Sequence, residues 1–69
     1  MDDHIYKKIE IIGTSEESSD DAVQNALAKA SGSIQNLRWF EVVETRGSIV
    51  EGDVGRWQVT IKVGFTMKS

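Results

Sequence analysis

The chain has 69 residues, a formal net charge of −3 and no cysteine. A single domain over residues 1–69 is expected, and so small a domain without disulfides or zinc–thiolate ligands predicts stabilisation by oligomerisation. The sequence has no basic cluster, which excludes a nucleic-acid surface. It also has neither a signal peptide nor an apolar run of the ~20 residues that cross a bilayer, and this predicts a cytoplasmic location.

The first predicted element is a strand over residues 5–12, because this segment is rich in β-branched side chains. We expect Gly13-Thr14-Ser15 to end it. A helix is predicted from Asp20 to about Ser31, and Ser18 with Asp21 resembles a capping box in which Asp replaces Glu. Its apolar side chains recur at helical spacing, and the small ones let the helix lie close to a sheet; they are Ala22, Val23, Ala26, Leu27 and Ala30.

Two further strands are predicted over residues 37–46 and 56–65, where apolar and polar residues alternate with a period of two. The core face of the last strand carries Trp57, Val59, Ile61, Val63 and Phe65. In the preceding strand we expect Phe40 and Val42 to join the core. The opposite, open face then carries Trp39, Glu41, Val43 and Thr45, with Trp39 beside Gln58. Residues 47–55 are long for a hairpin loop, so the strands run further into this segment or bend there.

The order strand–helix–strand–strand predicts an α+β fold. A right-handed crossover places the third strand between the first two, which gives a three-stranded antiparallel sheet of order 1-3-2 packed on one helix. The helix covers one face of this sheet, and no other predicted element covers the second face.

Several short segments of the sequence are informative when they are taken together. They are Tyr6-Lys7-Lys8-Ile9-Glu10, Gly13-Thr14-Ser15-Glu16-Glu17-Ser18, Asp21-Ala22, Asn25-Ala26, Trp39-Phe40-Glu41-Val42, Glu44-Thr45-Arg46-Gly47-Ser48-Ile49, Gln58-Val59 and Lys62-Val63-Gly64-Phe65. Each segment alone is unspecific, but their order and spacing over nearly the full chain make a specific match. The sequence thus resembles the dodecins, small flavin-binding proteins that assemble as hollow dodecamers. The resemblance implies a β-α-β-β fold, a single dodecin-like domain and a homododecamer.

The resemblance also implies a flavin site between subunits. In that family, flavins lie at two-fold axes between tryptophans of two chains, and a glutamine contacts the polar edge of the ring. Trp39 matches the tryptophan and Gln58 matches the glutamine. Arg46 is suggested for the phosphate of FMN or for a neighbouring subunit. The implied cofactors are riboflavin or FMN, with FAD also allowed and coenzyme A as a second ligand.

We interpret the chain as a flavin storage and sequestration protein that quenches flavin photochemistry, and not as an enzyme. The alternatives are a flavin-dependent redox enzyme and a purely structural assembly domain. No catalytic or metal-binding residues stand out, because His4 has no companion histidine and no two carboxylates are paired for acid–base chemistry. Two purely structural alternatives stay open: Trp39 as an ordinary interface residue, and Arg46 paired with Glu44.

Overall fold

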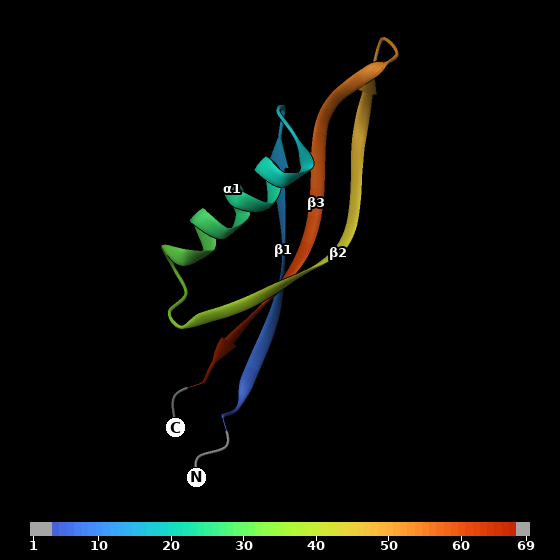
Figure 1. The fold of residues 1–69 in the computed structure, drawn as a ribbon. Coiled ribbons are helices and arrows are strands. Elements are labelled where there is room, and N and C mark those ends of the chain that lie inside the picture. Colours follow the sequence, from blue (N-terminus) through green and yellow to red (C-terminus); the bar gives the residue numbers. More distant parts are fainter. Residues whose placement is uncertain (1–3, 68–69) are drawn as a thin grey trace.

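The computed structural model describes residues 4–67, which form three strands and one helix (Figure 1). In chain order these are β1 (Tyr6–Ser15), α1 (Ser19–Ser31), β2 (Leu37–Val50) and β3 (Asp53–Thr66). Both outer strands pair antiparallel with β3, so the strand order is β1-β3-β2. The predicted β-α-β-β fold and the 1-3-2 order are therefore confirmed.

The strand β1 continues through Gly13–Ser15, so the prediction that this segment ends the strand is wrong. Gly13 pairs with Val59 in the middle of the sheet. A Cβ atom built on Gly13 would lie 2.1 Å from the carbonyl oxygen of Ala22 and 2.8 Å from the Cβ of Ala26. Glycine is thus required here because α1 approaches the backbone of β1 closely, and not because the chain turns.

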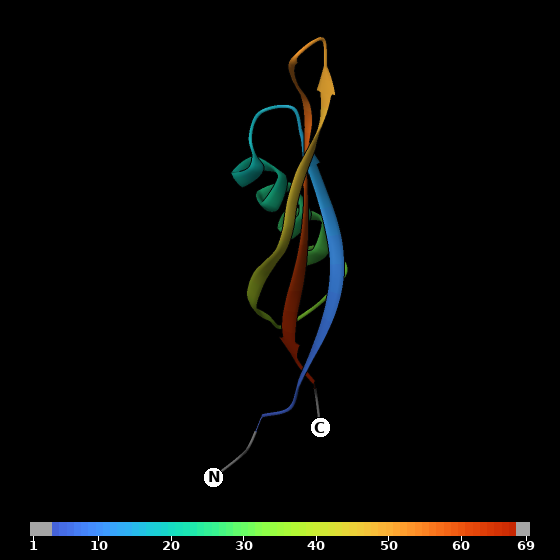
Figure 2. The same ribbon diagram turned by 90° about the vertical axis from the view of Figure 1, so that its right-hand side faces the viewer.

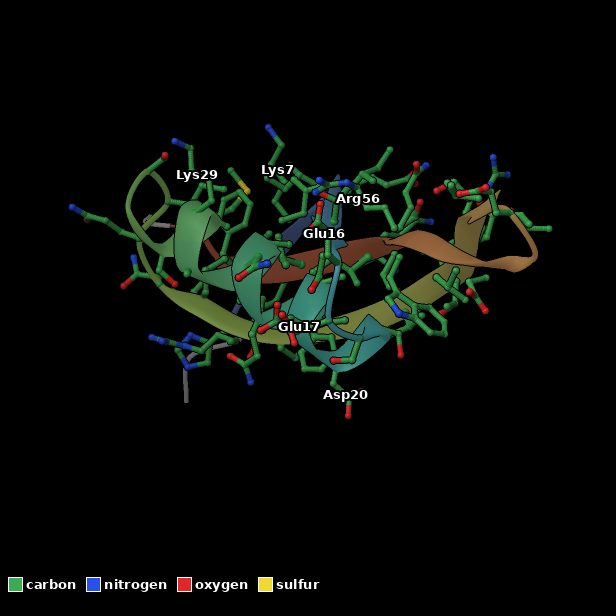
Figure 3. All side chains as sticks on the ribbon, turned by 90° about the horizontal axis from the view of Figure 1, so that it is seen from above. Lys7, Glu16, Glu17, Asp20, Lys29 and Arg56 are labelled. Atoms are coloured by element: carbon green, nitrogen blue, oxygen red, sulfur yellow. The ribbon has the colours of Figure 1, made fainter. Side chains whose placement is uncertain are left out.

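The helix α1 begins at the predicted cap. The hydroxyl of Ser18 accepts a hydrogen bond of 2.9 Å from the backbone N–H of Asp21. The carboxylate of Asp21 accepts a hydrogen bond of 2.6 Å from the hydroxyl of Ser15, which ties the helix to the end of β1. A second interaction fixes the segment between β1 and α1. Arg56 of β3 donates a hydrogen bond of 2.8 Å to the Glu16 carboxylate, and the two side chains face each other in Figure 3.

The hairpin between β2 and β3 is tight, which confirms the alternative in which the strands run into residues 47–55. Only Glu51 and Gly52 separate the strands, with φ angles of 51° and 85°. Positive φ at both central residues matches the type I′ turn that suits the twist of a hairpin. The hairpin consequently extends past the end of β1 (Figure 1).

The core lies between α1 and the central strand. Val59, Ile61 and Val63 of β3 are at most 1% exposed and pack against buried alanines of α1. Trp57 is partly buried against the same cluster, as predicted for the core face. Figure 2 shows that α1 covers only one side of the sheet.

Phe40 and Val42 do not join this core, which corrects the prediction. They pair with Val63 and Ile61 and so lie on the helix side of the sheet, yet 46% and 50% of their surfaces are exposed. The helix packs on β1 and β3, and its small alanines hold it too close to those strands to reach over β2. A groove of about 390 Å³ therefore separates α1 from β2, lined by Asp20, Val23, Gln24, Phe40 and Val42.

We predict that Gly13→Ala lowers the free energy of unfolding by about 1–3 kcal/mol, the usual cost of overpacking a tight contact. The added methyl group would collide with the Ala22 carbonyl, which is fixed in the helix backbone. Urea denaturation at constant protein concentration measures the change. Gly32→Ala is the control, because a Cβ there meets its nearest atom at 3.5 Å. Equal unfolding midpoints for Gly13→Ala and the parent would refute the close-approach argument.

Candidate functional site

The open face is the side of the sheet that faces away from α1. Cross-strand partners point to the same face, so the pairing register identifies its members. Four rows run across β1, β3 and β2: Lys8–Gly64–Trp39, Glu10–Lys62–Glu41, Ile12–Thr60–Glu44 and Thr14–Gln58–Arg46. All three predicted site residues therefore belong to the open face.

A β-bulge at Val43 is responsible for the position of Arg46. The pairing of β2 with β3 shifts between Val42 and Glu44, which reverses the alternation of β2 beyond that point. Arg46 consequently pairs with Gln58 on the open face. Thr45 pairs with Val59 on the helix side, so its predicted place on the open face is wrong.

The indole of Trp39 lies flat against β3. A Cβ atom on its partner Gly64 would lie 2.3, 2.4 and 2.4 Å from Cζ2, Cε2 and Cη2 of the indole. The Tyr6 ring of β1 contacts the same indole in a T-shaped arrangement, with 5.0 Å between centroids and 75° between planes. Because 40% of Trp39 is still exposed, the ring presents a supported apolar surface to whatever docks on the open face.

Gln58 is half-buried, but it does not lie beside Trp39 in the same chain. Trp39 is opposite Gly64, six residues along β3 from Gln58, which corresponds to about 20 Å. The prediction that the two side chains are neighbours is therefore wrong for a single chain. It rested on a shared face alone, and the register separates residues that share a face.

Arg46 forms an ion pair with Glu44 two positions earlier, at 2.9 Å between Nη2 and Oε2. The hydrogen bond and charge of Glu44 raise the pKa of Arg46 above its ordinary value. This ion pair is the structural alternative to a ligand contact for Arg46. Both side chains are largely exposed, so the pair adds little stability and is easily exchanged for another partner.

A second ion pair crosses the open face near Trp39. Lys8 on β1 donates a hydrogen bond of 2.9 Å to Glu41 on β2 and so spans the central strand. The hydrogen bond and then the charge of Lys8 lower the pKa of the Glu41 carboxyl. Because the Glu41 pKa is lower in the folded state, this ion pair stabilises the fold at pH values above the unfolded-state pKa of Glu41. The stabilisation is lost as the pH falls through the lowered, folded-state pKa.

We predict that Lys8→Met raises the pKa of Glu41 toward that of a free glutamate, because its main partner is removed. Carbon-13 NMR titration of the Glu41 carboxyl measures the shift. The matched control is Lys7→Met, since Lys7 is the next residue but pairs with Phe65 on the helix side. A Glu41 pKa that is the same in Lys8→Met and Lys7→Met would show that the ion pair does not form in solution.

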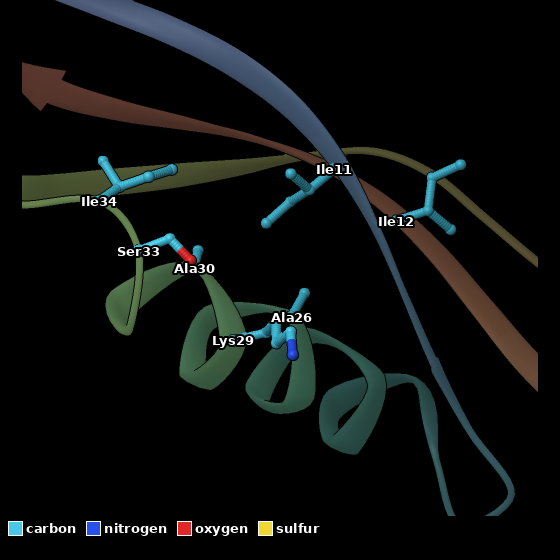
Figure 4. Close-up of a pocket in the computed structure, with 7 residues that line it drawn as sticks. All are labelled: Ile11, Ile12, Ala26, Lys29, Ala30, Ser33 and Ile34. Carbon is cyan, nitrogen blue, oxygen red and sulfur yellow. The ribbon is translucent and has the colours of Figure 1, made fainter.

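Another apolar cavity beside the helix lies away from these residues. It has a volume of about 340 Å³ between α1 and β1, and Figure 4 shows its lining side chains, among which Lys29 is the only charged one. None of the predicted site residues lines it. Within residues 4–67, no group of three or more metal-ligating side chains could hold an ion, and no helix is long and apolar enough to cross a membrane.

Comparison with known proteins identifies the family. Residues 5–68 match the family model described as Dodecin. A dodecin from Thermus thermophilus is 48% identical over 64 residues, which cover 93% of both chains. The structure of dodecin from Streptomyces davaonensis has a TM-score of 0.93 at 46% identity, covering 99% of this chain and 100% of the other. The calcium dodecin of Mycobacterium tuberculosis is 30% identical over 64 residues, or 93% of this chain and 90% of the other. The chain therefore belongs to the dodecin family.

Proposed function

We propose that this protein stores flavin by stacking riboflavin or FMN between Trp39 side chains of two copies, and that the stacked indoles quench flavin photochemistry. The observation that carries the proposal is the placement of Trp39, whose indole is supported by β3 and exposed on a sheet face that α1 leaves uncovered. Offset stacking of an aromatic pair adds about 0.5–1.5 kcal/mol beyond the burial of area. Membership of the dodecin family supports the same function.

The proposed site is shared between subunits. Because Trp39 and Gln58 of one chain are about 20 Å apart, a flavin stacked on Trp39 would receive the Gln58 amide from a different copy. A two-fold axis at the flavin makes every such contact twice. We therefore propose a homo-oligomer, the hollow dodecamer of the family, in which neighbouring copies also cover the exposed Phe40 and Val42.

Gln58 and Arg46 have different proposed roles. The Gln58 amide offers two donors and one acceptor, which suit the alternating groups along the pyrimidine edge of a flavin. Arg46 would hold the phosphate of FMN, or a carboxylate of a neighbouring copy, by exchanging its exposed partner Glu44. FAD and a second ligand such as coenzyme A are compatible with this proposal, although the described residues point to no place for the latter.

Stacking on both ring faces favours storage over redox catalysis, since a substrate would have no open face of the flavin to approach. Flavin fluorescence distinguishes the proposed storage function from a purely structural assembly. A structural assembly would leave added flavin free and fluorescent, whereas stacking would quench it.

We predict that Trp39→Ala abolishes flavin binding and quenching, because the stacking surface is lost. Titration of riboflavin with the protein, followed by flavin fluorescence, measures both. Trp57→Phe is the matched control, since Trp57 lies on the helix side of the sheet. Quenching that persists in Trp39→Ala would eliminate the proposed role of Trp39.

Replacing Gln58 by alanine should weaken flavin binding by about 1–3 kcal/mol, the usual cost of leaving a buried polar group of the ligand without a partner. Isothermal titration calorimetry measures the dissociation constant. Gln24→Ala is the control, because Gln24 is an exposed side chain of α1 on the other side of the sheet. If the two variants bind riboflavin equally well, Gln58 does not contact the ring.

A further inference from the structure

We infer that Gly64 is a positioning residue for the flavin site: its missing side chain lets the Trp39 indole lie flat on β3 with its other face turned outward. The inference rests on the proposed function and adds a residue to it. Gly64 itself is buried, and it lies opposite Trp39 in the middle of the sheet.

The contact geometry identifies the face of the ring. The three indole atoms nearest to a Cβ on Gly64 are consecutive in the six-membered ring, and their distances of 2.3, 2.4 and 2.4 Å are nearly equal. A point at nearly equal distance from consecutive ring atoms lies over the face of the ring and not at its edge. Any residue other than glycine would therefore place its Cβ inside the space of the indole.

A glycine at this position needs a reason, because glycine weakens the interior of a strand. A Cβ built on Gly13, Gly32 or Gly47 would have a backbone carbonyl oxygen as its nearest atom. A Cβ on Gly55 would be nearest to an aliphatic methyl carbon. Only at Gly64 are all three nearest atoms aromatic. Covering a strand glycine with a cross-strand aromatic ring is a known way of offsetting the instability that glycine brings.

Tyr6 restricts the indole from a second direction. Its ring plane is tilted by 75° from that of Trp39, so the two rings pack in a T-shaped arrangement and are not stacked in parallel. Gly64 backs one face of the indole and Tyr6 restricts its movement, while 40% of Trp39 stays exposed for contact with a planar ligand. A Cβ at position 64 would lift the indole from β3 and change its overlap with the ligand.

The first test is the variant Gly64→Ala in a Trp57→Phe background, where Trp39 is the only tryptophan. We expect acrylamide to quench Trp39 emission more strongly than in the parent, and the dissociation constant for riboflavin to rise about tenfold. Gly32→Ala in the same background is the control, since its Cβ has room. Parental acrylamide quenching together with parental riboflavin affinity would overturn the inference.

The second test is a double-mutant cycle of stability that needs no ligand. We expect Gly64→Ala to lower the urea midpoint when Trp39 is present and to leave it unchanged or raise it in a Trp39→Ala background, because the clash partner is gone. An equal loss in both backgrounds would show that Gly64 acts through something other than the indole.

The two proposals fail in different ways. If the parent binds no riboflavin, the proposed function is wrong, while acrylamide quenching and the stability cycle still decide whether Gly64 positions Trp39. If the parent binds riboflavin and the Gly64→Ala variant behaves like the parent in all measurements, only the positioning role is wrong.

Discussion

The pairing register between β2 and β3 is the constraint on which the rest of this structure depends. It places Trp39 over Gly64, which has no side chain, and it sets Gln58 about 20 Å farther along the sheet. The bulge at Val43 then brings Arg46 to the same face as Gln58. A shift of one residue would turn Trp39 toward the helix, because side chains alternate between faces.

The helix is the second constraint, since it covers too little of the sheet. Its alanines and Gly13 allow a very close contact with β1 and β3, and this contact buries the central valines and isoleucine. The same closeness keeps α1 away from β2 and leaves Phe40 and Val42 exposed. Within residues 4–67 no further helix or strand covers these two side chains, so β2 presents exposed apolar surface on the helix side of the sheet as well.

Local patterns predicted the elements of this fold, but not the contacts between them. The period-two alternation of β3, the Ser18 cap and the alanine stripe each reflect forces within a few residues, and all three are confirmed. The continuation of β1 past Gly13 depends on α1, and the positions of Arg46 and Gln58 depend on a bulge and on register. These features arise from pairing between distant segments. The glycine positions and the alternation within one segment do not indicate which residues of another segment it pairs with.

Under the proposed function, ligand binding and assembly are one equilibrium. A flavin that contacts Trp39 of one copy and Gln58 of another binds only to the assembled protein, so its binding free energy also stabilises the assembly. The supported indole matters for this coupling, because a ring held by Gly64 and Tyr6 loses little freedom when a ligand stacks on it. A strand with fixed side-chain directions is thus a better support for such a site than a loop would be.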